Sequence, residues 1–264
     1  GSNMCSDDSS LFVAMRDRAY RFDGQTGRLL RSFPVISNGA ANWGYIANDD
    51  GLLFGGSVKP GSEYTKFKGT PYWYDSTGTQ DTAKVCSDNL FAIEKQTGRK
   101  KWEYRGGKII NTTIAIGDGR VYFVESNSSS LRNEPTSRID SSSLWSSLRL
   151  VALNSQSGSK VWSKSITVNK SPYPVVFFLA QAKDRLILSY STSRFYVDAF
   201  STRNGIKVWS KNHSWNRNHH GGHMYHPVIV DDAVIVEPYG YSLSDGSTVH
   251  RGLPHRCSWS TSTA

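Results

Sequence analysis

A hairpin-like segment that recurs along the chain constrains its fold more than any other feature of the sequence. In each copy a short apolar run leads into a polar turn that closes on Gly, and a Trp follows four residues after that Gly. The three clearest copies span residues 90–102, 150–162 and 196–209. Glycine supplies the positive φ that a tight or bulged turn requires, so each copy predicts a β-hairpin. Because repeats of this kind define whole architectures, they are considered before any single motif.

Two degenerate copies flank the clear ones. Residues 19–27 are followed by Arg31 at the position of the Trp, and residues 241–246 are followed by His250 there. The five copies close on the turn glycines Gly27, Gly98, Gly158, Gly205 and Gly246.

Two further strand signals lie between successive hairpins, as in residues 109–116 and 120–125. No segment keeps an apolar period of 3.6 residues over three turns, so little helix is expected. Each unit is therefore interpreted as four short strands. Such units in series predict an all-β propeller with about five or six blades, or a stretch of a larger propeller.

Three tryptophans are expected to dock neighbouring blades together, with each ring over the next unit and its indole N–H on a backbone acceptor. They are Trp102, Trp162 and Trp209. Blades that bury one another's faces cannot be separated, so residues 11–264 are interpreted as a single domain. Residues 1–10 are interpreted as an expression scar, Gly1 to Met4, with an N-terminal tail.

Two insertions lengthen the first half of the chain. They span residues 59–85, rich in Gly, Thr, Tyr and Lys, and residues 126–147, rich in Ser. Loops of this length are usually solvated and mobile unless they serve a function. A binding surface is the alternative for the first insertion, because it contains four aromatic residues: Tyr64, Tyr72, Trp73 and Tyr74.

Composition excludes several classes of protein. At 38% hydrophobic residues the chain can bury a core, which excludes disorder as a description of the whole. No apolar run approaches the roughly 18 residues of a membrane-spanning helix. The net charge is +9, and the densest positive cluster, expected to be a solvated patch around one hairpin, is Lys95, Arg99, Lys100, Lys101, Arg105 and Lys108.

The basic charge has more than one interpretation. A nucleic-acid surface would need a continuous basic stripe with aromatic platforms, and the remaining positive residues are spread along the chain. An acidic protein partner, a polyanionic glycan or a negatively charged envelope surface fits the charge.

Histidines are concentrated near the end of the sequence. All seven lie after residue 212, and four are grouped closely: His219, His220, His223 and His226. Neutral imidazoles suit zinc, copper, nickel or iron, so these four are candidate ligand or metal-binding residues. Structural histidines hydrogen-bonded among strand ends are the alternative. On a strand His223 and His226 would point to opposite faces, although the glycines at 221 and 222 could bend the chain.

No catalytic residue is predicted. Nucleophile-elbow, zinc-protease and P-loop motifs are absent from the sequence. Three cysteines, Cys5, Cys86 and Cys257, are too few and too scattered for a disulfide scaffold. A closed propeller often brings its first and last strands into one blade, which would allow a disulfide between Cys5 and Cys257.

The repeat resembles the pyrroloquinoline quinone-like (PQQ-like) β-propeller repeat, with its tryptophan-docking motif, over roughly residues 11–260. Proteins with this repeat include quinoprotein dehydrogenases, which hold PQQ and calcium, and non-catalytic propellers similar to BamB, which bind other proteins. The dehydrogenases use two adjacent cysteines and a set of acidic ligands, whereas this chain has no adjacent cysteines and sparse acidic residues.

The resemblance therefore implies a protein- or ligand-binding scaffold in an extracytoplasmic bacterial compartment, periplasmic or secreted, without a cofactor. An enzyme is the alternative, either a relative of PQQ-dependent dehydrogenases or a metal-dependent activity at residues 219–226.

Overall fold

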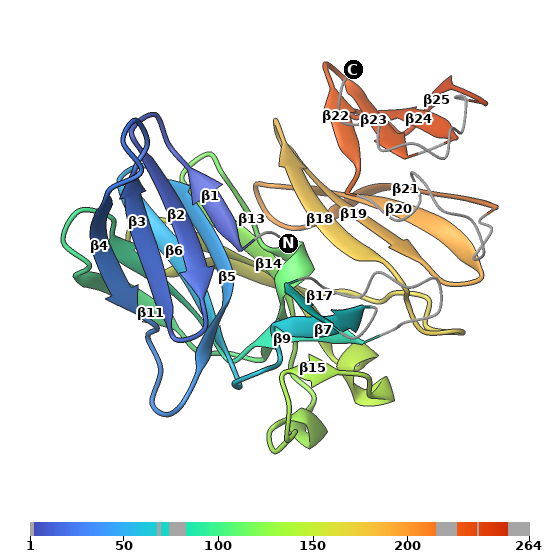
Figure 1. The fold of residues 1–264 in the computed structure, drawn as a ribbon. Coiled ribbons are helices and arrows are strands. Elements are labelled where there is room, and N and C mark those ends of the chain that lie inside the picture. Colours follow the sequence, from blue (N-terminus) through green and yellow to red (C-terminus); the bar gives the residue numbers. More distant parts are fainter. Residues whose placement is uncertain (1–2, 68–69, 74–82, 215–225, 237, 253–264) are drawn as a thin grey trace.

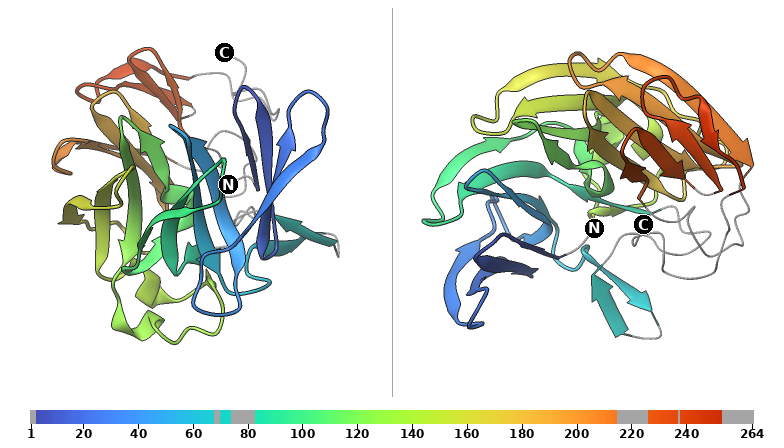
Figure 2. Two further views of the ribbon diagram at one scale, coloured as in Figure 1. Left: turned by 90° about the vertical axis from the view of Figure 1, so that its left-hand side faces the viewer. Right: turned by 90° about the horizontal axis from the view of Figure 1, so that it is seen from above.

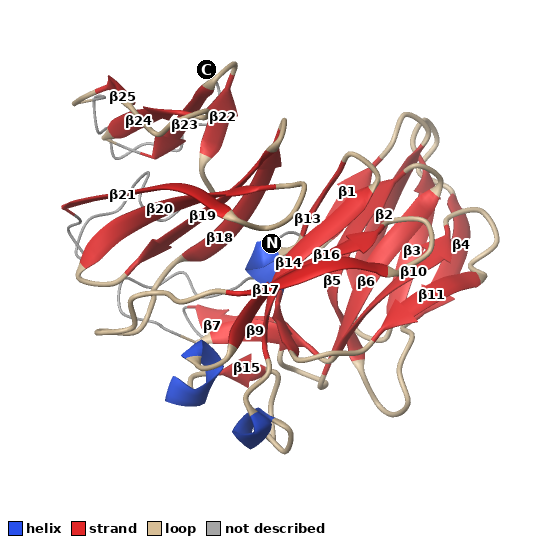
Figure 3. Ribbon diagram, turned by 180° about the vertical axis from the view of Figure 1, so that it is seen from behind, coloured by secondary structure: helices blue, strands red, loops and turns tan. Residues whose placement is uncertain are grey.

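The computed structural model describes residues 3–67, 70–73, 83–214, 226–236 and 238–252 (Figure 1). In these residues, five antiparallel sheets follow one another along an arc, with the first and last at its two ends (Figures 1 and 2); four of these sheets have four strands, and the third has seven because the insertions add strands to it. Helix is limited to three short 3-10 turns in the described part of the chain (Figure 3). The predicted four-stranded units and the scarcity of helix are confirmed.

The strands of the five units are as follows. The first sheet contains β1 (Met4–Ser6), β2 (Ser10–Met15), β3 (Arg18–Asp23) and β4 (Leu29–Pro34). The second contains β5 (Asn42–Asp49), β6 (Leu52–Val58), β10 (Asn89–Glu94) and β11 (Lys100–Tyr104). The third contains β12 (Lys108–Ile110) and β13 (Ala115–Gly117), separated by η1 (Asn111–Thr113), then β14 (Arg120–Ser126), β16 (Leu148–Asn154) and β17 (Lys160–Ser165). The fourth contains β18 (Phe177–Ala182), β19 (Arg185–Ser191), β20 (Arg194–Ser201) and β21 (Lys207–Ser214). The fifth contains β22 (Val228–Val230), β23 (Ala233–Val236), β24 (Tyr239–Ser242) and β25 (Thr248–His250).

The described residues of both insertions form regular structure. The first contains β7 (Tyr64–Phe67), β8 (Thr70–Trp73) and β9 (Lys84–Ser87). The second contains η2 (Ser129–Leu131), β15 (Arg138–Ile139) and η3 (Ser142–Trp145). Leu131, Leu144 and Trp145 of the second insertion are buried in the core, so the interpretation of residues 126–147 as a solvated loop is wrong. Side chains at 64–74 lie outside the described residues, and the aromatic surface expected there stays a prediction.

An apolar layer lies between each pair of neighbouring sheets. Successive residues of a strand point to opposite faces of the sheet, so they contact the neighbouring sheets on opposite sides. Leu90 and Ala92 of β10 belong to the layer against the third sheet, whereas Phe91 and Ile93 belong to the layer against the first. Burial of both faces explains why the central strands are almost continuously apolar.

Tryptophan and glycine join neighbouring sheets by one recurring contact. The indole Nε1 of Trp102 donates to the backbone oxygen of Ser155 over 2.7 Å. Its ring lies so close to Gly158 that a Cβ there would be 2.6 Å from it. Trp162 repeats this with Thr202 O and Gly205, and Trp209 repeats it with Leu243 O and Gly246.

Two side chains replace the tryptophan between the first and second sheets. Phe33 is buried and rests on Gly98, where a Cβ would lie 2.8 Å from its ring. The guanidinium of Arg21 donates to the backbone oxygen of Lys95, which occupies the place of Ser155 O. Arg31, at the tryptophan position of the repeat, instead donates to Thr97 O over 3.2 Å.

Residues 4–6, assigned to a tail from the sequence, form the edge strand β1 of the first sheet. Cys5 there pairs with Phe12 of β2. Backbone pairing of the partly buried Cys5 with the fully buried Phe12 explains why these residues form a strand. No helix among the described residues is long and apolar enough to cross a membrane.

Candidate functional site

The two insertions meet at one edge of the third sheet. The strand β9 of the first insertion pairs with β12 through Ile109 and Ile110, and β15 of the second insertion pairs with β9. The order β15-β9-β12-β14-β16-β17 therefore extends the sheet at its first-strand edge. Figure 1 shows β9 and β15 near β7, below the centre of the arc. We call residues 59–63, 84–88 and 134–139 the insertion junction.

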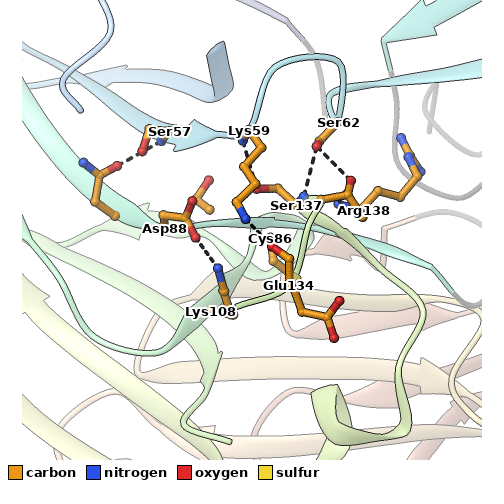
Figure 4. A network of polar contacts seen from close by, with 12 residues as sticks. Ser57, Lys59, Ser62, Cys86, Asp88, Lys108, Glu134, Ser137 and Arg138 are labelled. Atoms are coloured by element: carbon orange, nitrogen blue, oxygen red, sulfur yellow. Dashed lines mark hydrogen bonds and ion pairs between the residues drawn. The ribbon is translucent and has the colours of Figure 1, made fainter. Parts of the chain in front are cut away.

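Short hydrogen bonds tie the three segments of the insertion junction together (Figure 4). The backbone N–H of Lys59 donates to Ser137 Oγ over 2.9 Å, and the N–H of Ser137 donates to Ser62 Oγ over 3.0 Å. The N–H of Cys86 donates to Ser137 O over 2.8 Å, and the ammonium of Lys59 donates to Glu134 O. Ser137 is buried, so these bonds satisfy polar groups that burial would otherwise penalise.

Charged groups in and beside the insertion junction are held in place, and two of them, Glu63 and Lys84, are buried. Lys108 forms an ion pair with Asp88, which follows β9 directly (Figure 4). Glu63 is 2% exposed, and its Oε1 accepts a hydrogen bond of 2.5 Å from the amide of Asn42. Burial raises the pKa of the Glu63 carboxyl, while the bond from Asn42 opposes this. The ammonium of Lys84 is also buried and donates to Ala83 O over 3.2 Å.

Asparagine side chains fix the return of the first insertion to the second sheet. Asn89 Oδ1 accepts the N–H of Ser57 over 3.0 Å. Asn111 Oδ1 accepts both the N–H and the hydroxyl of Ser87, and its amide donates to Gly44 O over 2.7 Å. The insertion junction is thus anchored to the propeller at the Ser87 end of β9.

A polar pocket of about 360 Å³ opens beside the insertion junction. Its lining residues are Asp88, Gly106, Gly107, Lys108, Ser126, Asn127, Ser128, Leu131 and Arg132. Behind the pocket wall, the carboxylate of Glu125 accepts the N–H of Gly107 over 2.9 Å and the hydroxyl of Tyr104 over 3.1 Å. Burial, with the neighbouring Glu125 carboxylate, raises the pKa of Tyr104.

A larger pocket of about 540 Å³ lies between the third and fourth sheets. Arg120 lines it and donates to Thr202 O over 2.7 Å. The same oxygen accepts the indole N–H of Trp162. This pocket therefore belongs to a contact that joins two sheets, and the pocket of 360 Å³ is the better candidate for binding.

The basic cluster around the second hairpin is paired with carboxylates. Each cation has a carboxylate oxygen within 4.0 Å, in the pairs Lys95–Asp7, Arg99–Glu94, Lys100–Glu103, Lys101–Glu94, Arg105–Glu103 and Lys108–Asp88. Several of these cations are exposed, as expected for a solvated patch, but the six cations share four acidic side chains, so much of the positive charge is compensated. Hydrogen bonds from Arg99 and Thr97 lower the pKa of Glu94 to about 2.

Only His226 of the predicted histidine group lies within the described residues. Its ring stacks on Phe178 of β18 with 4.1 Å between centroids. Loss of hydration beside this ring lowers the pKa of His226 to about 4, although part of the side chain is exposed. The imidazole is then neutral at pH 7, as a metal ligand must be. His219, His220 and His223 lie outside the described residues, so their grouping stays a prediction.

Another histidine, which sequence reasoning did not single out, is buried between the last two sheets. His213 Nδ1 shares a hydrogen bond of 2.9 Å with the hydroxyl of Tyr241, and its ring stacks on Phe195. Its apolar neighbours on β20 and β24 indicate a packing role. Trp209 and His213 are the two buried residues of β21, but Lys211 between them leaves no apolar alternation in the sequence that would have indicated the burial of His213.

Within the described residues, no three His, Cys, Asp or Glu side chains are grouped closely enough to hold a metal ion. Cys86 is buried and its thiol donates to Lys84 O over 3.6 Å. Cys257 lies outside the described residues, so a disulfide with Cys5 stays a prediction.

Comparison with known proteins completes the assignment. No curated protein matches the chain in sequence. Among solved structures, a quinohemoprotein alcohol dehydrogenase, ADHIIG, from Pseudomonas putida HK5 is similar in fold, with a TM-score of 0.55 and 11% identity over 97% of this chain and 41% of the enzyme. This chain thus spans about two fifths of the enzyme's length, and at this identity the likeness concerns the fold alone.

Two further structures are similar at lower scores. BamB from Moraxella catarrhalis has 15% identity over 92% of this chain and 70% of its own, with a TM-score of 0.39. The Pan2 WD40 domain of Neurospora crassa has 10% identity over 94% of this chain and 64% of its own, with a TM-score of 0.48.

The family model described as outer membrane protein assembly factor BamB matches residues 1–251, nearly the whole sequence. This match, with the four-stranded units and the likeness to the dehydrogenase propeller, confirms both the predicted β-propeller and the predicted resemblance. The chain therefore belongs to the BamB family of PQQ-like β-propellers.

Proposed function

We propose that this chain is a non-catalytic binding module that takes up a protein partner at the insertion junction, in an extracytoplasmic compartment of a bacterium. One observation carries the proposal. Two insertions that interrupt the regular repeat at different points of the sequence converge on one sheet edge, where β9 and β15 pair. Converging insertions on a rigid scaffold are a common way to build a binding surface.

The chemistry of the insertion junction favours binding over catalysis. Lys108 is held by Asp88, and the carboxylate of Glu125 is held by Gly107 and Tyr104. Groups engaged in this way position a surface, whereas a general acid or base needs a proton-transfer partner within reach of the substrate.

The adjacent pocket is suited to side chains of a partner protein. Its volume of about 360 Å³ is at the lower end of the range for small-molecule sites. The exposed Arg132 and Asn127 at its rim, together with Lys108, provide hydrogen-bond donors. An acidic or amide side chain of a partner would complement them.

Membership of the BamB family supports the compartment. The family description refers to assembly of outer membrane proteins, and we propose a partner from that envelope layer. The positive net charge would also help the chain meet acidic surfaces.

Site-specific photo-cross-linking tests the proposal. A benzoylphenylalanine placed at Asn127 should give a discrete cross-linked protein in cells that produce the chain. The matched control carries the same group at Val161, which is exposed on β17 at the opposite edge of the same sheet. Equal cross-linking from both positions, or none from Asn127, would contradict a partner site at the insertion junction.

An assay for the alternative function completes the design. The purified chain is incubated with PQQ, calcium, a primary alcohol and an artificial electron acceptor dye. We expect no dye reduction above the protein-free background. Reduction that depends on both PQQ and the chain would overturn the non-catalytic role, whatever the cross-linking shows.

A further inference from the structure

A second pocket adjoins the pocket of about 360 Å³ at the same end of the third sheet. It has a volume of about 450 Å³, and Asn127 lines both pockets. The first pocket lies between the residues before β12 and the end of β14, and the second lies between the start of β16 and the end of β17. We call the two pockets together the sheet-end groove. The strand order β12-β14-β16-β17 places it across the ends of four neighbouring strands.

The four strand ends under the sheet-end groove are nearly level. Lys108 of β12 pairs with Ser126 of β14, Ser126 pairs with Leu148 of β16, and Arg149 pairs with Ser165 of β17. Paired strands lie about 4.8 Å apart, so the four strands span about 14 Å. An extended chain rises about 3.3 Å per residue, and about four residues of a peptide would therefore cross the groove.

The lining of the sheet-end groove carries more positive than negative charge. It contains three cations, Lys108, Arg132 and Arg149, and one carboxylate, Asp88. Asp88 forms the ion pair with Lys108 described above. Among the residues that the structure describes, no carboxylate oxygen lies within 4.0 Å of either arginine. Each pocket thus contains one arginine whose charge is left for a ligand, unlike the paired cations around the second hairpin.

Neutral groups hold the guanidinium of Arg149 in place. Its Nε donates to Ser163 Oγ over 2.7 Å, and its Nη2 donates to Ser163 O over 3.2 Å. Its Nη1 donates to Ser165 Oγ over 3.3 Å. Glu125 pairs with Arg149 across β14 and β16, but its carboxylate accepts the hydrogen bonds from Gly107 and Tyr104 instead. A guanidinium fixed in this way is pre-organised to bind a carboxylate.

Apolar side chains accompany the polar groups in both pockets. Leu131 in the first pocket and Leu148 in the second are 1% and 2% exposed, and Ile166 in the second is half-buried. No aromatic residue is among the lining residues of the two pockets. Sites for single-stranded nucleic acids stack bases on aromatic rings, so this lining favours a peptide over a nucleic acid.

We propose that the sheet-end groove binds an extended acidic segment of the partner, about four residues long, with one carboxylate on Arg132 and a second on Arg149. The inference rests on the proposed function, which supplies a protein as the occupant. The two pockets are centred two strand spacings apart, about 10 Å, which is the rise of three extended residues. The segment therefore carries acidic side chains three positions apart. Arginine binds a carboxylate by two parallel hydrogen bonds, so this spacing would give specificity as well as affinity.

Fluorescence polarisation with synthetic peptides and the full chain tests the proposal. The probe is a fluorescein-labelled, capped hexapeptide with glutamate at its second and fifth positions and serine elsewhere. The comparison peptide has glutamine at those two positions. We expect the glutamate peptide to bind roughly tenfold more tightly or better, and its binding should weaken as the salt concentration rises.

Charge-removing variants locate the peptide on the chain. Arg132→Gln and Arg149→Gln should each weaken binding of the glutamate peptide roughly three- to tenfold, because each removes the carboxylate's partner in one pocket. The matched control is Lys160→Gln, which removes the same charge at an exposed residue at the opposite end of β17 from the groove. It should bind the peptide as the wild type does. Circular dichroism checks that each variant is folded.

Four results would overturn the proposal. Equal binding of the two peptides, or binding of neither, would show that the groove does not recognise carboxylates. A loss from Arg132→Gln without one from Arg149→Gln would show that no segment crosses from one pocket to the other. An equal loss from Lys160→Gln would attribute the binding to net charge. Tighter binding of a fluorescein-labelled heparin tetrasaccharide than of the glutamate peptide would assign the groove to a polyanionic glycan.

Failure of this inference is distinguishable from failure of the proposed function. A protein cross-linked at Asn127, without a preference for the glutamate peptide, would support the partner site and reject the acidic segment. A glutamate preference that both arginine variants reduce, without any cross-linked protein, would support the groove and reject the proposed partner site.

Discussion

Replacing two glycines with alanine separates the tryptophan contact from backbone strain. Gly158 and Gly27 both have φ of +69° at the same position of the repeat, so a Cβ costs each about 1 to 2 kcal/mol of strain. At Gly158 the new Cβ would also lie 2.6 Å from the ring of Trp102, whereas at Gly27 it meets nothing. Moving the ring should cost a further roughly 1 to 3 kcal/mol by overpacking. Weakening the bond from Trp102 to Ser155 O should add about 1 kcal/mol.

We therefore expect Gly158→Ala to lower the free energy of unfolding by about 2 to 4 kcal/mol more than Gly27→Ala. Urea unfolding followed by far-ultraviolet circular dichroism measures the free energy of unfolding of both variants. Changes in the unfolded state are shared by the two substitutions and cancel in the difference. Equal losses for the two variants would refute the idea that Trp102 closes this interface.

Trp102→Phe provides an internal check on the same contact. It keeps an aromatic ring near Gly158 but removes the indole N–H, so it should cost roughly 1 to 2 kcal/mol. In the Gly158→Ala background the cost should be smaller, because that bond is already weakened. Strictly additive losses would show that the two residues act independently.

Three further predictions concern charge and metal binding. Burial raises the pKa of Asp7, but hydrogen bonds from Lys95 and Ser9 outweigh it and lower the pKa to about 2. Asp7→Asn should therefore lower the free energy of unfolding by at most about 2 kcal/mol at pH 7. In urea unfolding this difference between variant and wild type should disappear as the pH falls from 4 to 2. Because burial raises the pKa of Glu63, ionisation of this carboxyl opposes folding. The melting temperature of Glu63→Gln should therefore rise relative to that of the wild type as the pH increases from about 4.5. A difference in melting temperature that does not change with pH would contradict this. Elemental analysis of protein without a histidine tag should distinguish a metal site at residues 219–226 from structural histidines. One bound metal per chain would identify the site if that metal is lost in a variant with the four histidines replaced by alanine.

Local sequence carried enough information to predict the repeating unit. The Gly-to-Trp spacing encodes a hairpin with a bulge, and the register shift occurs at the equivalent place in β10, β16 and β20. The docking of Trp102 follows from that geometry. What replaces tryptophan in the first unit could not be predicted, because Phe33 and Arg21 come from different strands and meet the second sheet only after folding.

The insertion junction was beyond sequence reasoning for a related reason. The pairing of β9 with β12 and of β15 with β9 joins segments far apart in sequence. Their residues show no periodicity that distinguishes such strands from loop. Burial of Trp145 and Leu144 was equally hidden, because a serine-rich context is typical of exposed loops.

The ion pairs of the basic cluster were hidden in the same way. Counting lysines and arginines along the chain does not reveal that Asp7 and Asp88 fold back beside Lys95 and Lys108.

The most direct test of the account is the affinity of the chain for the partner captured by cross-linking at Asn127, measured by isothermal titration calorimetry. The test variant replaces two exposed pocket residues, Asn127→Ala with Arg132→Ala. The matched control is Val161→Ala, at the far edge of the same sheet. If the insertion junction is the binding surface, the double variant should bind roughly tenfold more weakly or worse, and the control should bind as the wild type does. Equal affinities for the wild type and the double variant would contradict the central claim.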